Sequence, residues 1–397
     1  MIAKVDLMVM HDLSANFVTR VFREELGDGT IIDPSRIAFV FDHNFSPATE
    51  EAARTLHGVR RFAATHGIKH LFNGGNGSLH HVIIENGLWA PGQVIIGCDS
   101  HTPIYGALGV FATGVGNNSM AALGFQHGLA WFRVPMTVQV HLHGETKEAV
   151  GPRDVAQYVV GYMGEDSAIY RAIEYAGPYI ESLSVEDRML FPLMSIDLGA
   201  KASFINPDDK TLTYARSLSN FKDFEMATND ANVKYENVID IDVSLLEPQV
   251  ACPPTVGNVK SVAEVAGAPI DIAEIGGSTG GRLDDLRIAA SCLRGRRVAA
   301  EVRFQVVPAN RSVYKSALRE GLIEALHDAG AVIFPPSAGS NQAVNMGAMS
   351  GEEVMISNQA RNFPGRNGHP KAKHYLASAR TVAASALKGR IADPREV

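Results

Sequence analysis

The chain has 397 residues, a net charge of −7 and an ordinary globular composition, with 46% hydrophobic and 20% charged residues. Its length predicts two or three domains, and it has neither a basic block nor an apolar run of about 20 residues, which argues against nucleic-acid partners and membrane spans. Because polar residues interrupt the start of the chain where a signal peptide needs an apolar core, we expect a cytoplasmic protein.

Short apolar runs alternate with helical patterns in the first third of the chain. Residues 36–43 and 92–101 are apolar runs that end in polar residues. Residues 47–67 predict a helix, with a proline near its start and a glycine past its end. Residues 106–129 are rich in small residues and predict another helix. This alternation predicts an α/β fold, in which polar residues at the carboxyl ends of strands face the ligand crevice.

The rest of the chain continues the same alternation. Residues 136–145 have the period-two pattern of a strand, and residues 151–164 predict a helix. The stretch 246–258 contains three prolines and is interpreted as a connection. After it, residues 270–290 predict a strand, a glycine turn and a helix. We therefore expect three α/β domains, at residues 1–134, 135–250 and 251–397.

Acid, base and hydrogen-bonding groups gather in four short stretches. They comprise Asp42, His43 and Asn44, then Ser78, His80 and His81, then Asp99, Ser100 and His101, and finally Glu174. A lone His is more often structural, but a neighbouring carboxylate fixes the imidazole tautomer and raises its basicity, which favours a catalytic role for the Asp–His pairs. The triplet at 99–101 can equally cap the segment that follows it.

Three arginines follow glycine-rich turns, namely Arg282, Arg361 and Arg366. Planar guanidinium groups suit the recognition of a carboxylate, and surface salt bridges are the alternative. The cysteines Cys98, Cys252 and Cys292 form no CxxC pattern and predict neither a disulfide framework nor a zinc site. We expect the latter two to be small buried hydrophobes, whereas the role of Cys98, beside the triplet, stays open.

Together and in order, these stretches resemble the aconitase superfamily, and within it the large subunit of 3-isopropylmalate dehydratase. The resemblance rests on "VDLMVMHD", "FDHN", "NGGNGSLHHVIIENG", "DSHTPIYGALGVFATGVG", "IEYAGPYIESLSVEDRM" and "ARNFPGR". It implies a three-domain aconitase-like α/β architecture without the C-terminal swivel domain. In the dehydratases that domain is a separate small subunit, so the resemblance also implies such a partner and a small polycarboxylate substrate.

The positions that hold a 4Fe–4S cluster in this family are occupied by other residues here. The family's Ser-Cys-Thr-Asn-Gly-Arg motif reads "GSTGGR", which puts Ser278 at the cysteine position. Its Cys-Gly-x-Cys motif reads "PPSAGSN", which puts Ala338 and Asn341 at the other two. Two asparagines that line the cluster in the family are replaced as well, by Leu193 and Ala360. Because such clusters are held by thiolates, we expect no 4Fe–4S cluster in this chain.

The resemblance implies roles for the groups that remain. The catalytic set is Asp42, His43, His80, Asp99, Ser100, His101 and Glu174, with His43 paired to Asp42, His80 to Asp99 and His101 to Glu174. The substrate-binding set is Ser278, Thr279, Arg282, Arg361 and Arg366. Without iron, a protonated His, or a divalent metal ion on the same His and Asp groups, would activate the leaving hydroxyl, or the reaction would be an isomerisation.

Two functions therefore stay open at the level of the sequence. One is an iron–sulfur-free lyase or isomerase of a small di- or tricarboxylic acid. The other is a catalytically inactive relative that binds a carboxylate ligand or regulates a partner subunit. The retained acid–base groups favour the enzyme.

Overall fold

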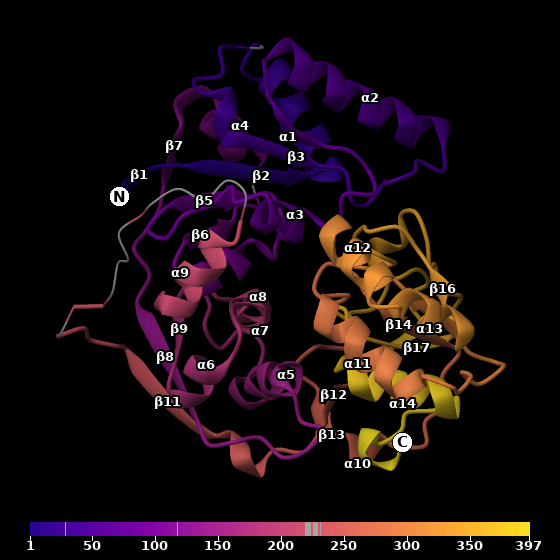
Figure 1. Cartoon of the computed structure of the whole chain (residues 1–397). Coiled ribbons are helices and arrows are strands. Elements are labelled where there is room, and N and C mark those ends of the chain that lie inside the picture. The colour runs from indigo at the N-terminus through magenta and orange to yellow at the C-terminus, as the bar shows by residue number, and fades with distance from the viewer. Residues whose placement is uncertain (28, 117, 219–223, 225–228, 231) are drawn as a thin grey trace. The chain divides into compact units, whose positions relative to one another are not determined.

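The structure is a computed structural model of the chain, and it describes residues 1–27, 29–116, 118–218, 224, 229–230 and 232–397 (Figure 1). The chain divides into two compact units that are each discontinuous in sequence. The first unit comprises Met1–Gly74, Leu79–His143 and Asp166–Asp242, and the second comprises Gly75–Ser78, Gly144–Glu165 and Val243–Val397. Among the described helices, none has the length and apolar character needed to cross a membrane.

The first sheet of the first unit is parallel throughout, in the order β4-β3-β2-β5-β6. Its strands are β2 (Leu7–His11), β3 (Ile37–Val40), β4 (His70–Phe72), β5 (Val94–Gly97) and β6 (Phe111–Gly114). The chain runs from β2 outward to β4 and then returns to β5 on the other side of β2, so the strand order reverses there. Open α/β sheets bind ligands at such a reversal, beyond the carboxyl ends of the strands.

Three helices cover one face of this sheet: α1 (Asp12–Glu24), α2 (Glu50–Thr65) and α4 (Asn118–His127). Their phenylalanines Phe22, Phe62 and Phe125 contact one another in one apolar core with the strands. The helix α3 (Leu79–Glu85) contacts β2, β3 and the 3-10 helix η2 (Thr102–Leu108). The unit also contains η1 (Pro34–Arg36) and an antiparallel pair, β1 (Ile2–Lys4) with β7 (Leu129–Trp131).

The second sheet of the first unit is also parallel, in the order β10-β9-β8-β11. Its strands are β8 (Thr137–His143), β9 (Ala172–Ala176), β10 (Ala202–Phe204) and β11 (Asn237–Asp242). Its helices are α6 (Pro178–Ser182), α7 (Val185–Arg188), α8 (Leu190–Met194), η3 (Ser195–Leu198) and α9 (Asp209–Arg216). Buried and half-buried residues alternate along β8, which confirms the strand predicted from the period-two pattern.

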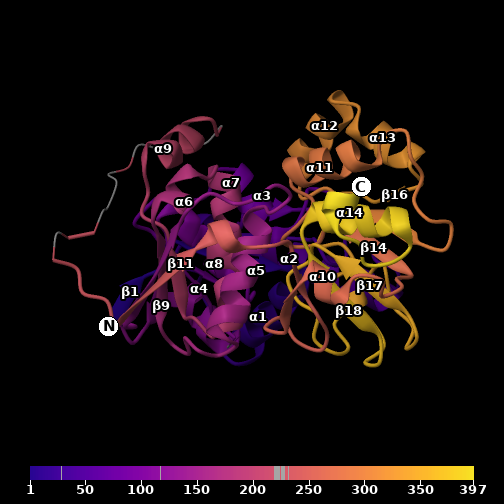
Figure 2. The ribbon, with the colours of Figure 1, turned by 90° about the horizontal axis from the view of Figure 1, so that it is seen from below.

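The second unit contains one mixed sheet, in the order β13-β12-β18-β17-β14-β15-β16. Its strands are β12 (Gln249–Ala251), β13 (Val259–Ser261), β14 (Ile272–Ile275), β15 (Arg303–Val306), β16 (Val332–Ile333), β17 (Val354–Ser357) and β18 (Lys373–Ala377). Its helices are α5 (Pro152–Met163), η4 (Val243–Leu245), α10 (Val262–Val265), α11 (Leu283–Leu293), α12 (Arg311–Arg319), α13 (Leu322–Asp328), η5 (Asn341–Ala343), α14 (Ala379–Lys388) and η6 (Pro394–Glu396). The helices α11 and α14 lie against each other and against β14 (Figure 2).

Two of the predicted elements are wrong. Residues 106–129 are not one helix: η2 ends at Gly109, whose φ of 72° is left-handed, and β6 and α4 follow. The strand β6 forms because it pairs in parallel with β5, a contact that the local pattern does not reveal. The stretch 246–258 is not only a connection, because β12 inside it pairs with both β13 and β18.

The two compact units are not divided at the predicted domain boundaries. The main sheets use residues 7–114, 137–242 and 249–377. The first two sheets belong to one compact unit, and the segment 144–165, which contains α5, belongs to the second unit with the third sheet. The division at residues 134 and 250 stays a prediction.

Candidate active site

In the first unit, a buried cluster of His and Asp side chains lies where the strand order of the first sheet reverses. Asp99 lies just beyond the end of β5, after Cys98, and its Oδ1 lies 2.8 Å from His80 Nε2 and 3.4 Å from His101 Nδ1. The same oxygen accepts the backbone N–H of His101 at 2.7 Å, so part of its role is to fix the turn. Burial alone would raise the pKa of Asp99, but hydrogen bonds from His101 and His80 hold that pKa well below its usual value.

A second Asp–His pair follows β3. His43 Nδ1 lies 2.8 Å from Asp42 Oδ1, and the other oxygen of Asp42 accepts the backbone N–H of Leu79 at 2.7 Å. Burial would lower the pKa of His43, but the charge and hydrogen bond of Asp42, together with the charges of Asp12 and Asp99, outweigh burial, so this pKa is raised above its usual value. His43 Nε2 is buried and has no hydrogen-bond partner among the described residues. The pair therefore favours the protonated imidazole and leaves Nε2 to a ligand.

His11 and Asp12 are site residues that the sequence reasoning missed. His11 ends β2, and its Nε2 lies 3.7 Å from Asp99 Oδ2 while its ring lies 4.4 Å from that of His43, so it connects the two Asp–His pairs. Burial and the neighbouring His43 lower the pKa of His11. Asp12 accepts the backbone N–H groups of His43 and Asn44, at 3.1 and 2.8 Å. In the sequence, the signal for these two site residues is the adjacent His-Asp pair at the end of the apolar run that forms β2.

The structure gives Glu174 amide and hydroxyl partners, and its expected pairing with His101 stays a prediction. Glu174 lies in β9, and its carboxylate accepts hydrogen bonds from Gln139 Nε2 at 3.1 Å, Asn229 Nδ2 at 2.9 Å and Tyr235 Oη at 2.8 Å. The acidic partner that the structure records for His101 is Asp99. Glu174 thus belongs to a polar network of the second sheet, and Ser100, between Asp99 and His101, is half-buried.

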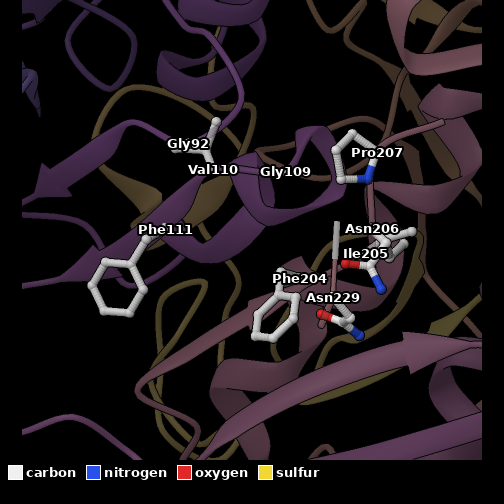
Figure 3. Close-up of a pocket in the computed structure, with 9 residues that line it drawn as sticks. All are labelled: Gly92, Gly109, Val110, Phe111, Phe204, Ile205, Asn206, Pro207 and Asn229. Carbon is white, nitrogen blue, oxygen red and sulfur yellow. The ribbon is translucent and has the colours of Figure 1, made fainter. Parts of the chain in front are cut away.

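A pocket of about 250 Å³ opens beside Glu174 in the same unit. The nine residues that line it are Gly92, Gly109, Val110, Phe111, Phe204, Ile205, Asn206, Pro207 and Asn229 (Figure 3). Two of them, Asn206 and Asn229, direct amide nitrogens to Glu174, at 3.5 and 2.9 Å from its oxygens. The predicted catalytic residues do not line this pocket, so we do not equate it with the acid–base cluster.

In the second unit, the loops that carry the predicted substrate-binding residues and the cluster-ligand positions follow parallel strands of one sheet. Ser278 and Thr279 follow β14, Ala338 and Asn341 follow β16, and the arginine loop at 358–368 follows β17. Thr279 is buried and donates to the carbonyl of Asn358 at 3.1 Å. This contact joins two of the loops, so part of the role of Thr279 is to hold them together.

Arg153 is a further residue, after His11 and Asp12, that the sequence reasoning missed. It lies in α5 and is buried, and its guanidinium donates to the carbonyls of Asn358 and Gln359, the first at 3.1 Å. The predicted substrate-binding Arg282 is the N-cap of α11, with its Nη2 3.4 Å from Asp285 Oδ1. Arg361 is half-buried. Arg366 is also half-buried and lies over the ring of Phe363, 5.4 Å from its centroid. The arginine loop therefore offers two partly exposed cations.

The positions matched to the cluster cysteines do not fit an iron–sulfur cluster. Ser278, Ala338 and Asn341 offer no thiolate, and the Ala338 side chain is fully buried. Cys252 packs in the core of the second unit, where Cys292 also lies, and burial raises the pKa of the Cys98 thiol in the first unit to about 12. In the part of the chain that the structure describes, no group of three or more metal-ligating side chains contains a cysteine.

One group of side chains has the composition of a divalent-cation site. The ligand atoms of His11, Asp12, Asp42 and His43 lie within 4.8 Å of one another, and all four residues are buried. However, the Asp12 carboxylate already accepts three protein N–H donors, two from the backbone and one from the Asn44 amide at 3.0 Å. Asp42 likewise accepts from Leu79 and faces His43. Both carboxylates of the group are therefore already engaged by protein donors, whereas His43 Nε2 is not.

Comparison with known sequences agrees with this geometry. The family model described as "Aconitase family (aconitate hydratase)" matches residues 2–268 and 258–389. The chain is 43% identical over 394 residues to "3-isopropylmalate dehydratase large subunit 1" of Methanopyrus kandleri, which covers 99% of this chain and 94% of that relative. It is also 43% identical over 400 residues to the protein of the same name from Pyrococcus furiosus, covering 100% of this chain and 93% of that relative.

A solved structure shares the fold. The holo-form of aconitase X from Thermococcus kodakaraensis matches with a TM-score of 0.51 and 12% sequence identity, over 90% of this chain and 84% of that one. At this identity the match supports the α/β fold alone.

Proposed function

Because this chain belongs to the aconitase family and is a hydro-lyase at the level of that family, we propose that it acts on a small di- or tricarboxylic acid without an iron–sulfur cluster. The chemistry is a dehydration, a hydration or a double-bond isomerisation by His and Asp side chains. The observation that carries the proposal is the buried Asp42–His43 pair, whose Nδ1 is held by the carboxylate while Nε2 is left to a ligand.

In a dehydration, His43 gives its Nε2 proton to the departing hydroxyl, which leaves as water. The base takes the proton from the carbon next to a carboxylate, and the electron pair of that C–H bond forms the new double bond. His101, held by Asp99, is the residue of this chain that we assign to the second proton transfer. His80, also on Asp99, helps His101 to hold the pKa of that carboxylate well below its usual value.

The carboxylates of the substrate need cationic partners. We assign this role to Arg361 and Arg366, which are half-buried in the arginine loop after β17, with Ser278 on the loop after β14. Thr279 and Arg282 support these loops, because each is already engaged with a protein oxygen.

The relatives are named large subunits, and we propose that this chain also works with a small partner subunit. The alternative to acid catalysis by His43 is a divalent cation at the His11–Asp12–Asp42–His43 group, which has suitable residue types. The two readings differ in their response to a chelator, so one experiment separates them.

The test is a panel of hydroxy and unsaturated di- and tricarboxylic acids, monitored by enoate absorbance in the presence of a chelator and absence of iron. We expect turnover with at least one acid, and His43→Asn to lower it by about 10²–10⁴-fold. The exposed His57→Asn in α2 is the matched control and should leave turnover unchanged. Turnover that disappears with the chelator and returns with a divalent metal would replace the acid mechanism by the metal one.

A further inference from the structure

A buried carboxyl–amide network lies beside the loops that would carry the cluster. Glu274 is in β14 and is fully buried, and its Oε1 accepts from Gln359 Nε2 at 2.6 Å and from the backbone N–H of Ser340 at 3.5 Å. Gln359 Nε2 also reaches Ser340 Oγ at 2.6 Å, and Asn367 Nδ2 donates to that hydroxyl at 2.8 Å. The four side chains thus join β14 itself to the segments that follow β16 and β17.

We call the loop that carries Ser278, after β14, and the loop that carries Ala338 and Asn341, after β16, the cluster-position loops. Glu274 and Gln359 pack directly against them. A Cβ built on Gly339, between Ala338 and Ser340, would lie 2.9 Å from Glu274 Oε1. A Cβ built on Gly277, next to Ser278, would lie 2.8 Å from Gln359 Cγ. Glu274 and Gln359 would therefore have to shift to admit a side chain at these glycines, and the backbone of Gly277 lies as close to the Gly339 position as Glu274 does.

From these contacts we propose that Glu274 and Gln359 occupy the interior beside the two cluster-position loops, and that their hydrogen bonds to Ser340 fix the loop after β16 in a chain without a cluster. The inference deepens the proposed function and rests on its assignment of Ser278, Ala338 and Asn341. Restoring the three cysteines is then not sufficient for cluster binding, because two further side chains occupy the volume. Burial raises the pKa of Glu274, although the hydrogen bonds from Ser340 and Gln359 and the charge of Arg303 oppose this rise.

The test compares three variants after anaerobic reconstitution with ferrous iron and sulfide. The first carries Ser278→Cys, Ala338→Cys and Asn341→Cys. The second adds Glu274→Val and Gln359→Ala. The third adds instead Thr381→Ala and Ser385→Ala, two buried polar residues of α14 outside the network, as the matched control. Iron and acid-labile sulfide per chain and visible absorbance are measured on each.

We expect cluster uptake only by the second variant, which combines the three cysteines with Glu274→Val and Gln359→Ala and is called the five-site variant below. Uptake by the three-cysteine variant to the same stoichiometry would overturn the inference, and so would a five-site variant that keeps its circular dichroism and binds no iron. The wild-type chain distinguishes failure of the inference from failure of the proposed function. Iron uptake by the wild type contradicts the proposed function. Uptake by the three-cysteine variant but not by the wild type contradicts only the inference.

A second measurement applies if the five-site variant does not fold. Glu274→Ala and Gln359→Ala should each lower the melting temperature of the otherwise unchanged protein. The double variant should lower it by clearly less than the sum of the two shifts, because either substitution already breaks the shared hydrogen bond. Additive shifts would overturn the inference.

Discussion

At the scale of single residues, Asp42 decides the charge of His43. Its carboxylate lies 2.8 Å from His43 Nδ1 and, with the charges of Asp12 and Asp99, outweighs the effect of burial, so the pKa of His43 is raised. If His43 is the acid, its protonated form is the active one and activity falls as the pH rises through this pKa. Asp42→Asn removes the charge and should move the alkaline limb of the kcat/KM profile to lower pH.

The measurement is kcat/KM against pH for the wild type and the variant on the substrate found in the panel. Asp33→Asn, in the turn before η1, is the control and should leave the profile in place. A variant profile that coincides with that of the wild type would remove His43 from the role of acid.

His374 gives a second prediction at this scale. It is buried, its Nε2 lies 2.7 Å from Ser357 Oγ, and burial followed by the charges of Arg366 and Arg153 lowers its pKa from 6.5 to about 3. Below pH 6.5 the unfolded chain binds a proton at this residue that the folded chain does not, so stability falls as the pH drops toward 3.

The expected loss is about 2 kcal/mol of unfolding free energy between pH 6.5 and pH 5, at about 1.36 kcal/mol per pH unit. Denaturant unfolding at both pH values checks this, with His374→Gln as the reference that cannot titrate. Equal losses in the two proteins would mean that His374 is protonated in the folded state as well.

At the scale of elements, the glycine-rich stretch after the 99–101 triplet allows close backbone packing. A Cβ on Gly106 in η2 would lie 1.6 Å from the carbonyl oxygen of Ser203 in β10, and the Gly106 carbonyl accepts from Ile205 N–H at 2.9 Å. Gly106→Ala must separate η2 from β10, and we expect a loss of roughly 1–3 kcal/mol of stability together with lower activity.

The activity falls because η2 begins directly after His101. The matched control is Gly58→Ala in α2, where nothing lies within 4 Å of the added Cβ, and helix propensity predicts a gain of up to about 1 kcal/mol. Thermal unfolding of both variants measures the difference. An unchanged melting temperature in Gly106→Ala would show that the two elements can separate freely.

The sequence predicted those elements whose signal is local. The strands before Asp42 and Asp99 and the helices α2 and α5 were found because apolar period, caps and turn residues lie within each segment. The strand β6 was not found because only its pairing with β5 defines it, and β12 was not found because it pairs with β18, which is distant in sequence.

The same reasoning explains the site. Asp42 and His43 are adjacent in the chain, so their pairing could be predicted, and His80 with Asp99 came from the family resemblance. His11 could not be assigned, because its contact with Asp99 depends on β2 lying between β3 and β5. Glu274 could not be assigned either, because within β14 nothing in the sequence shows which donors surround it.

At the scale of the whole molecule, the cofactor content is the direct prediction. After anaerobic reconstitution with iron and sulfide, the wild-type chain should hold no stoichiometric iron and show no visible cluster absorbance, because Ser278, Ala338 and Asn341 supply no thiolate. Elemental analysis after desalting measures this. Four iron atoms per chain would contradict the prediction and would assign the ligand role to Cys98, Cys252 and Cys292.

The interleaving of the two units has a consequence for how the chain is made. Arg153 is synthesised long before its partners Asn358 and Gln359, which follow it by 205 and 206 residues. At about 5–20 residues per second on the ribosome, roughly 10–40 s pass between the synthesis of Arg153 and that of the two carbonyls to which its guanidinium donates. During that time the first unit completes its chain up to Asp242, while α5 is outside the exit tunnel without the sheet that it will cover. The nascent protein therefore exposes one amphipathic helix between two folding events, and chaperones have a defined interval in which to bind it.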